Sequence, residues 1–418
     1  MTNSSVVIRT PSTGVPIHLD APSAALARFP HEQIAQLIAL RRELHRHPEL
    51  SWQEYATSDR LARIAESLGG EVTRVANTGV IARFRGQDPH APVVAVRGDI
   101  DALPIHEATG LDYTSAVPGV MHACGHDVHA TWAIGAAMDL VRQPAHGDVL
   151  VVLQPAEEVG GGAAAILATG ALDGVQAIFG GHVDRRFAVG EVVAESGPLA
   201  ASADAFTITL TGRGAHGARP HESADPIVAA AAVITALQTI VARRIDPAVP
   251  AVCTVGSVHA GVASNVIPED AVLTGTLRAM DAPTRRRLSE EVVRLATSVA
   301  EAYGVQARVI VSHGTPPIVN PVREAQWART AATQLLGEEA VVPFGITNMG
   351  GEDFAFYMER IPGCFLRIGA REAGGEAVAA HSPRFFAADG AILVGAAVLA
   401  QCARVASAAL AEKSQGMA

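Results

Sequence analysis

The spacing of apolar residues along the chain predicts alternating strands and helices. Residues 31–47 repeat apolar positions with the spacing of a helix, and a proline ends the pattern. Further along, short continuous apolar runs occupy 93–96, 149–153 and 177–179, and stretches with helical spacing, such as 130–141, lie between them. Short apolar strands separated by helices are typical of a mainly parallel sheet covered on both faces. This part of the sequence therefore predicts an α/β fold.

The pattern changes near residue 200. Residues 205–211 alternate polar and apolar side chains, which indicates a strand with one face in water. The next segments predict a helix, two strands, a helix and a strand, at 226–243, 252–258, 271–278, 283–303 and 307–312. This order is that of a two-layer α+β sandwich. We therefore predict a smaller domain over 200–313, inserted between the two parts of an α/β catalytic domain, 1–199 and 314–418.

The two ends of the chain differ in character. The first thirty residues are rich in Pro, Ser and Thr, and we expect an irregular arm there, whose role the sequence leaves open. No basic segment followed by a long apolar run is found at the N-terminus, so no signal peptide is expected. Residues 391–411 are the most apolar stretch, but their uninterrupted apolar part ends at Gln401. That part is too short to span a membrane, and it predicts a buried C-terminal helix.

Composition and charge exclude several classes of protein. Of the 418 residues, 49% are hydrophobic and 18% are charged, which is typical of a compact globular protein. Asp and Glu outnumber Lys and Arg by 42 to 32, and a net charge of −10 disfavours nucleic acid or a membrane as partner. The four cysteines form no C-x-x-C pair, so we expect reduced thiols and a cytoplasmic location.

Candidate chemistry gathers at the predicted strand ends. Parallel sheets bind ligands at the carboxyl ends of their strands. The acidic, imidazole and thiol groups that follow the predicted strands, or lie in the loops between them, are Asp99, Asp101, Cys124, His126, Glu157, Glu158, His182 and His381. Together they have the composition of a transition-metal site.

Two pairs of residues carry this interpretation. Taken alone, Cys124 and His126 are more simply explained as a buried thiol and the start of a helix. The other ligand types at separate strand ends favour a metal site instead. Adjacent Glu157 and Glu158 are either solvated loop acids or, if buried, a pair that needs a cation or a proton. In the second case one carboxylate ligates metal and the other acts as a base. A cysteine hydrolase with Cys124 as nucleophile would leave these acids and the distant histidines unexplained.

Several motifs, taken in order, point to one family. They are RELHRHPEL (42–50), DIDALP (99–104), GVMHACGHD (119–127), QPAEE (154–158), GAHGARPH (214–221), SNVIP (264–268) and MGGEDF (349–354). From about residue 36 to about 400, the chain resembles the amidohydrolase branch of the M20 metallopeptidase superfamily. This branch includes hippurate hydrolases, indole-acetyl-amino-acid hydrolases and N-acyl-amino-acid deacylases.

The resemblance implies a metal-dependent enzyme that cleaves N-acyl amino acids to a carboxylic acid and a free amino acid. It implies two divalent ions, Mn, Zn, Ni or Co, bound by Cys124, His126, Glu158, His182 and His381. Glu157 would be the general base, and Asp101 would orient the site from behind the ligands. A dipeptidase or carboxypeptidase with the same metals is the alternative. A binding protein on this fold would have lost a ligand or Glu157, and this chain keeps them all.

The resemblance also implies a homodimer formed through the inserted domain. His216 would enter the partner's active site and donate to the substrate carbonyl, whereas Asn265 and Arg278 would stay near the substrate carboxylate. Gly351, in the last motif, is a further candidate for substrate binding. Two departures from the family pattern leave the substrate open: Gly181 stands where Leu is expected, which suggests a more open pocket wall, and Arg384 follows the His381 motif.

Overall fold

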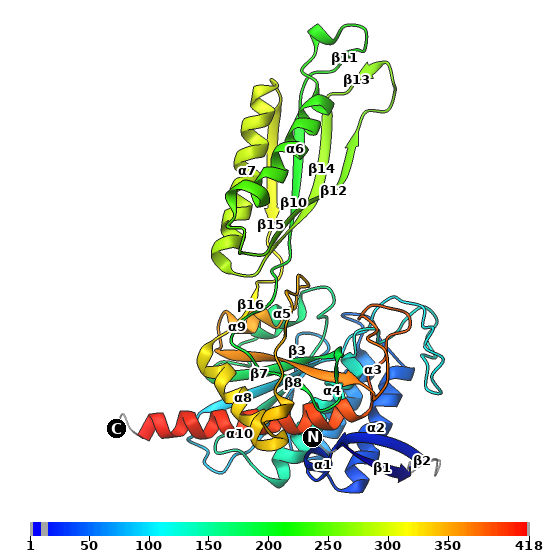
Figure 1. The fold of residues 1–418 in the computed structure, drawn as a ribbon, viewed down its shortest axis with the longest axis vertical. Helices are drawn as coiled ribbons and strands as arrows, with labels where there is room; N and C mark the ends of the chain where they lie inside the picture. Colours follow the sequence, from blue (N-terminus) through cyan, green and yellow to red (C-terminus); the bar gives the residue numbers. More distant parts are fainter. Residues whose placement is uncertain (1–2, 10–15, 416–418) are drawn as a thin grey trace. The chain divides into compact units, whose positions relative to one another are not determined.

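The structure is a computed structural model that describes residues 3–9 and 16–415 and divides the chain into two compact units (Figure 1). Unit 1 comprises Met1–Gly197, Asn320–Gly345 and Phe356–Ala418, and unit 2 comprises Pro198–Val319 and Ile346–Ala355. Unit 2 thus extends beyond the expected 200–313 and includes a second segment of the chain. One link holding that segment is the backbone N–H of Ala201, which donates to the carbonyl of Gly350 at 3.0 Å.

Unit 1 is built on a seven-stranded mixed sheet in the order β3–β4–β6–β5–β7–β17–β8. The bounds are β3 (Glu71–Val75), β4 (Gly79–Phe84), β5 (Val93–Asp99), β6 (Val149–Gln154), β7 (Val175–Ala188), β8 (Val192–Val193) and β17 (Gly363–Arg371). The central strands β6, β5, β7 and β17 are parallel neighbours, and the outer pairings are antiparallel. The predicted α/β fold is confirmed. At one edge the pairing is antiparallel because β3 and β4 are joined by a short turn, which only antiparallel strands allow.

The helices of unit 1 include two that pack against each other and against β5, namely α4 and α10. The bounds are α1 (Ser23–Leu26), α2 (His31–Arg46), α3 (Tyr55–Ser67), α4 (His126–Arg142), α5 (Gly162–Ala168), α8 (Val322–Leu336) and α10 (Gly390–Gln415), with η2 (Glu338–Ala340) and α9 (Ala355–Met358) as short turns. Helix α10 is long and apolar enough to cross a membrane, although the sequence pattern indicated that its apolar part is too short. However, 78% of its most apolar 18-residue segment is buried within the protein, as predicted for a core helix.

The N-terminal segment is ordered where the structure describes it, and the expected irregular arm is wrong. Strands β1 (Asn3–Arg9) and β2 (Pro16–Pro22) pair antiparallel, and α1 follows them. Leu19 and Ala21 are buried in the core of unit 1, whereas Asp20 between them is exposed. This alternation is the signature of a strand, and the surrounding Pro, Ser and Thr concealed it. Residues 1–2 and 10–15 lie outside the described residues.

Unit 2 is a two-layer sandwich, as predicted. Its antiparallel sheet has the order β12–β14–β10–β15, and α6 and α7 pack together on it. The bounds are β10 (Asp204–Thr211), α6 (Pro226–Arg244), β12 (Ala251–Ala260), β14 (Asp270–Ala279), α7 (Ala282–Ala302) and β15 (Gln306–Ser312). The smaller elements are β9 (Gly197–Ala200), β11 (Ala215–His216), η1 (Pro220–Glu222), β13 (Val266–Ile267) and β16 (Ile318–Asn320). Asp225 and Asp281 cap the first turns of the two helices.

The contact between α4 and α10 makes a testable prediction about Gly395. A Cβ at Gly395 would lie 2.2 Å from Cε3 of Trp132 on α4. In an open helix site, replacing Gly by Ala raises the free energy of unfolding by about 0.5–1 kcal/mol. We expect Gly395→Ala to lower it instead, by about 1–3 kcal/mol, because the core must move to admit the methyl group. Urea unfolding measures whether the free energy of unfolding falls or rises. A variant that is more stable than the unaltered protein would contradict this packing.

Candidate metal centre

The five expected ligands come together in unit 1 from separate elements. Their positions are Cys124 in the loop before α4, His126 at the first residue of α4, Glu158 after β6, His182 in β7 and His381 after β17. They form two sets, one of Cys124, His126 and His182 and the other of Cys124, Glu158 and His381. Within each set the ligand atoms lie within 4.8 Å of one another. Cys124 is common to both sets.

The β7 strand carries His182 in its interior, not after its end as the sequence pattern indicated. The strand continues because His182 pairs with Arg367 of β17 in parallel register. Gly181 faces the other side of the sheet, where a Cβ would lie 3.5 Å from Cβ of Leu366 and 3.7 Å from Cγ1 of Ile368. Because those side chains belong to the core, Gly181 does not line a pocket beside His182. The expectation of a more open pocket wall at this residue is wrong.

The start of α4 depends on Gly125. This residue has φ +88°, and a Cβ here would lie 2.5 Å from Cγ2 of Val183 in β7. Glycine therefore allows both the left-handed turn and the close approach of the helix to the strand. The turn places His126 at the helix start with its ring directed to the site.

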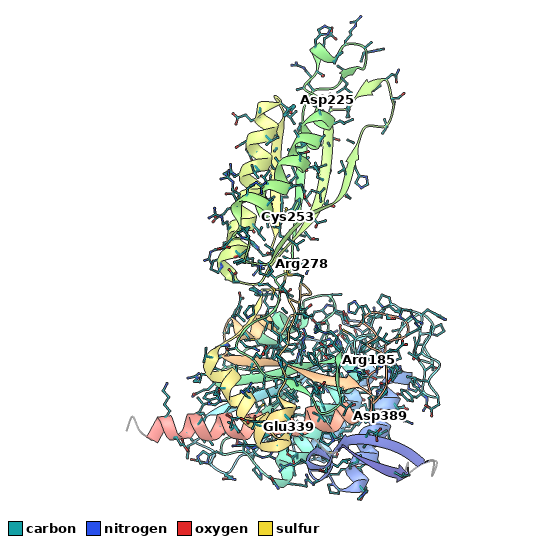
Figure 2. All side chains as sticks on the ribbon, in the orientation of Figure 1. Arg185, Asp225, Cys253, Arg278, Glu339 and Asp389 are labelled. Atoms are coloured by element: carbon teal, nitrogen blue, oxygen red, sulfur yellow. The ribbon has the colours of Figure 1, made fainter. Side chains whose placement is uncertain are left out.

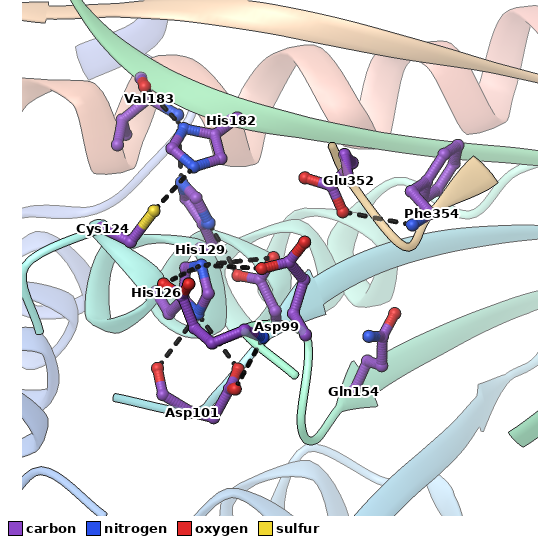
Figure 3. A network of polar contacts seen from close by, with 12 residues as sticks. Asp99, Asp101, Cys124, His126, His129, Gln154, His182, Val183, Glu352 and Phe354 are labelled. Carbon is purple, nitrogen blue, oxygen red and sulfur yellow. Dashed lines mark hydrogen bonds and ion pairs between the residues drawn. The ribbon is translucent and has the colours of Figure 1, made fainter. Parts of the chain in front are cut away.

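The ring of His126 is held so that one nitrogen remains available. Its Nδ1 lies 3.0 Å from the carbonyl oxygen of Asp101 and 3.1 Å from Oδ1 of the same residue (Figure 3). Its Nε2 lies 3.8 Å from Oε1 of Glu158. Among the described residues, neither of these two buried atoms has a hydrogen-bond partner. Because burying polar atoms unsatisfied costs free energy, a cation at each of the two sets, one beside His126 and one beside Glu158, fits these atoms.

The ring of His182 is also held at one nitrogen, and its other nitrogen faces Cys124. His182 Nδ1 lies 2.7 Å from the Val183 carbonyl, and its Nε2 lies 3.1 Å from Sγ of Cys124 (Figure 3). Burial, followed by the Glu158 carboxylate, raises the pKa of the Cys124 thiol. Burial also raises the pKa of Glu158 and lowers that of His182. A nucleophilic cysteine needs a lowered pKa, whereas a metal ligand is deprotonated by the cation itself.

Asp101 contacts two of the candidate ligands. Besides holding His126, it accepts a hydrogen bond from the backbone N–H of Glu158, at 3.0 Å from Oδ2. The same oxygen accepts from the hydroxyl of Ser51 at 2.7 Å. Asp101 is 1% exposed, so its orientation is fixed by these partners. Ser51 could not be predicted from the sequence, because a lone serine belongs to no motif.

A buried polar chain lies behind His182. The backbone N–H of Val183 donates to Nε2 of His129 at 3.0 Å, and Nδ1 of His129 lies 2.7 Å from Oδ1 of Asp99. Asp99 forms an ion pair with Arg97, whose Nε donates to Oε1 of Gln154 at 2.8 Å. The chain ties α4, β5, β6 and β7 together. Sequence reasoning missed this role, although a histidine three residues after His126 on the same helix is a visible signal.

Of the other expected site residues, Glu157 lies in unit 1, with Oε2 3.9 Å from Nε2 of His126. His216, Asn265, Arg278 and Gly351 lie in unit 2 as two separate pairs. His216 pairs with Val266 across β11 and β13, and the N–H of Gly217 donates to the Asn265 carbonyl at 2.8 Å. A Cβ at Gly351 would lie 3.6 Å from Nη1 of Arg278, so these two residues are neighbours.

These two pairs lie at opposite ends of unit 2. Arg278 is eight residues beyond Asp270, where β14 begins after β13, which corresponds to about 26 Å along a strand. Figure 2 shows Arg278 at the end of unit 2 opposite to Asp225, where α6 begins.

Comparison with known proteins decides the family. Residues 95–405 match peptidase family M20/M25/M40. The chain belongs to this family. It is 41% identical over 372 residues to an N-acetylcysteine deacetylase of Bacillus subtilis, covering 88% of this chain and 96% of the relative. It is 35% identical over 371 residues to thermostable carboxypeptidase 2 of Saccharolobus solfataricus, covering 86% and 92%.

The M20 family also contains a solved structure similar to this chain. It is a dinuclear metal-binding peptidase of Bacillus subtilis, with a TM-score of 0.80 and 37% sequence identity. The match covers 90% of this chain and 99% of that one. The chain is thus an M20 hydrolase with groups of residues capable of binding metal.

The two adjacent carboxylates of this M20 centre should respond differently to substitution. Glu158 belongs to a set that includes Cys124 and His381, and Glu157 belongs to neither set that contains Cys124. We expect Glu158→Gln to weaken metal binding at least about tenfold, since a neutral amide is a poor ligand for a divalent cation. Glu157→Gln should retain the metal content of the unaltered protein. Calorimetric titration with Mn²⁺ or Zn²⁺ measures both, and equal affinities would contradict the assignment.

Proposed function

We propose that this protein is a metal-dependent amidohydrolase that cleaves N-acyl amino acids to a carboxylic acid and a free amino acid. The observation that carries the proposal is the division of the five candidate ligands into two sets that share only Cys124. The relatives support the substrate class, because a deacetylase of N-acetylcysteine and a carboxypeptidase both cleave an amide whose nitrogen belongs to an amino acid.

The two sets would hold two divalent ions, and Cys124 is a candidate ligand in both sets. Thiolate, imidazole and carboxylate ligands favour Mn, Zn, Ni or Co over Mg. When bound, such ions make water more acidic and polarise an amide carbonyl. The residues that would hold them are Cys124, His126, Glu158, His182 and His381, with Asp101 orienting His126 and the Glu158 backbone from behind.

Glu157 is the proposed general base. Its Oε2 lies 3.9 Å from Nε2 of His126, so the carboxylate is beside the ligands. In this role Glu157 accepts a proton from the attacking water and delivers it to the departing amine nitrogen. The reaction then yields the carboxylic acid and the free amino acid with no net change in the protonation of Glu157.

The residues of unit 2 would bind the rest of the substrate. Arg278 can hold the amino-acid carboxylate by charge-assisted hydrogen bonds, with Gly351 beside it leaving space for that group. His216 can donate to the carbonyl oxygen as negative charge develops there, with Asn265 as its neighbour. Because about 26 Å of strand separates these pairs, one copy of unit 2 cannot offer both to one small substrate. We therefore propose a homodimer in which His216 comes from the partner, as expected. Asn265 was expected beside Arg278 at the substrate carboxylate, but it lies next to His216, so we propose that it also comes from the partner.

The surface of unit 2 supports such a dimer. Strand β12 is an edge of the sheet and offers unpaired backbone groups to another chain. On α6, which packs against β12, Ile227 and Val228 are 45% and 50% exposed. Exposed apolar side chains beside an open sheet edge are typical of protein interfaces.

Two further proposals concern substrate range and location. A dipeptidase or carboxypeptidase activity on the same centre is the second candidate, favoured by the similarity to the carboxypeptidase of Saccharolobus solfataricus.

The four cysteines are free thiols in the structure, which supports a reducing compartment such as the cytoplasm.

The proposed activity is tested by a substrate panel of N-acetyl and N-aryl-acyl amino acids, their carboxamides, and dipeptides. We expect the N-acyl amino acids to be hydrolysed, a chelator to abolish turnover, and added Mn²⁺, Co²⁺, Ni²⁺ or Zn²⁺ to restore it. Glu157→Gln should lower kcat by about 10²–10⁴-fold, because Gln cannot accept the proton. Full activity in protein shown to be metal-free by elemental analysis would contradict the proposal, and faster cleavage of dipeptides would favour the second candidate.

The proposed dimer is tested by mixing two inactive variants. His216→Ala should lower kcat at least about a hundredfold, the scale of losing one donor to the developing oxyanion. Mixing this chain with Glu157→Gln should restore part of the activity, because one site of each hybrid dimer would keep both groups. If native mass spectrometry shows subunit exchange and no activity returns, His216 does not act in the partner's site.

A further inference from the structure

A buried carboxylate outside the metal centre contacts the turn that carries Glu157. Glu54 directly precedes α3 and is fully buried. It makes no side-chain cap on its own helix. Instead, Oε1 accepts from the backbone N–H of Ala156 at 2.9 Å, and Oε2 accepts from the hydroxyl of Thr78 at 2.6 Å. Since both partners donate, the side chain works here as a double hydrogen-bond acceptor.

Ala156 has a backbone conformation that needs support. Its φ is +51°, in the left-handed region that side chains other than glycine rarely adopt. Its carbonyl accepts from the N–H groups of Gly161 and Gly162, at 3.3 and 3.2 Å. Glu54 therefore fixes the amide side of Ala156 while the two glycines fix its carbonyl side. Glu157 directly follows Ala156, so it continues the chain from this turn.

We propose that Glu54 is a positioning residue for Glu157, acting through the Ala156 N–H. The inference rests on the proposed role of Glu157 as general base. Glu158 has a different support, because its N–H donates to Asp101, which Ser51 also contacts. The backbone on either side of Glu157 is thus held by separate hydrogen bonds, at Ala156 and at Glu158. Loss of Glu54 should disturb proton transfer while the metal ligands keep their places.

Kinetics of matched variants test this role. Glu54→Ala should lower kcat at least about tenfold with KM changed less than about twofold, since small misplacements of a reacting group are costly. Both metal ions should remain. Glu54→Gln should keep most of kcat, because its amide oxygen can accept from Ala156 while its NH₂ group donates to Thr78 Oγ1.

The matched control is Glu49→Ala. Glu49 accepts from the N–H groups of Ala56 and Thr57 in the first turn of the same helix, at 3.1 and 2.8 Å. This variant should lower Tm less than Glu54→Ala, because Glu49 is only partly buried, and it should leave kcat unchanged. Ala156→Gly added to Glu54→Ala should recover part of kcat, because glycine adopts positive φ without strain.

Hydrogen exchange in the metal-free protein gives a readout that needs no substrate. We expect Glu54→Ala to speed exchange of the amides in residues 156–162, and Glu49→Ala to leave them unchanged. Unchanged exchange in Glu54→Ala, an unchanged kcat, or a loss of metal in proportion to the loss of activity would overturn the proposal. If the unaltered protein hydrolyses no N-acyl amino acid, the proposed function fails, whereas faster exchange would still show that Glu54 holds this turn.

Discussion

The Cys124 sulfur is the group that both halves of the candidate metal centre share. It is 8% exposed and lies in the loop that leads into α4, with His182 on one side and the set of Glu158 and His381 on the other. Burial and the nearby Glu158 carboxylate raise the pKa of this thiol. Binding of a cation by Cys124 would therefore release a proton, and it would link the loop before α4 with residues of separate elements of unit 1.

The structure around this atom consists largely of fixed hydrogen-bond acceptors. Asp101 holds His126 and the Glu158 backbone, and His129 holds the backbone beside His182. These groups are buried and hydrogen-bonded, and removing one would leave its partners unsatisfied at a large cost. Rigid support of this kind keeps ligands and base within the small tolerance that catalysis requires. Glu54 extends the same support to the turn before Glu157.

Sequence reasoning predicts most of the architecture because apolar spacing is strong in the long helices and central strands. It predicts the two-layer order of unit 2 and brings the five candidate ligands to one rim of unit 1. Sequence reasoning fails where the spacing of apolar residues is short or interrupted. The hairpin containing Leu19 was hidden by Pro, Ser and Thr, and β7 continues through Gly180 and Gly181 only because β17 pairs with it. Glu54 carries no motif of its own, and only the fold shows that it reaches Ala156.

Anomalous diffraction from crystals of the zinc-loaded protein tests the central claim most directly. The account predicts two anomalous peaks in each chain, each about 2.3 Å from Sγ of Cys124, the usual zinc–thiolate distance. One peak should also contact His126 and His182, and the other should contact Glu158 and His381. A single peak, or two peaks of which one lies out of contact with Cys124, would contradict it.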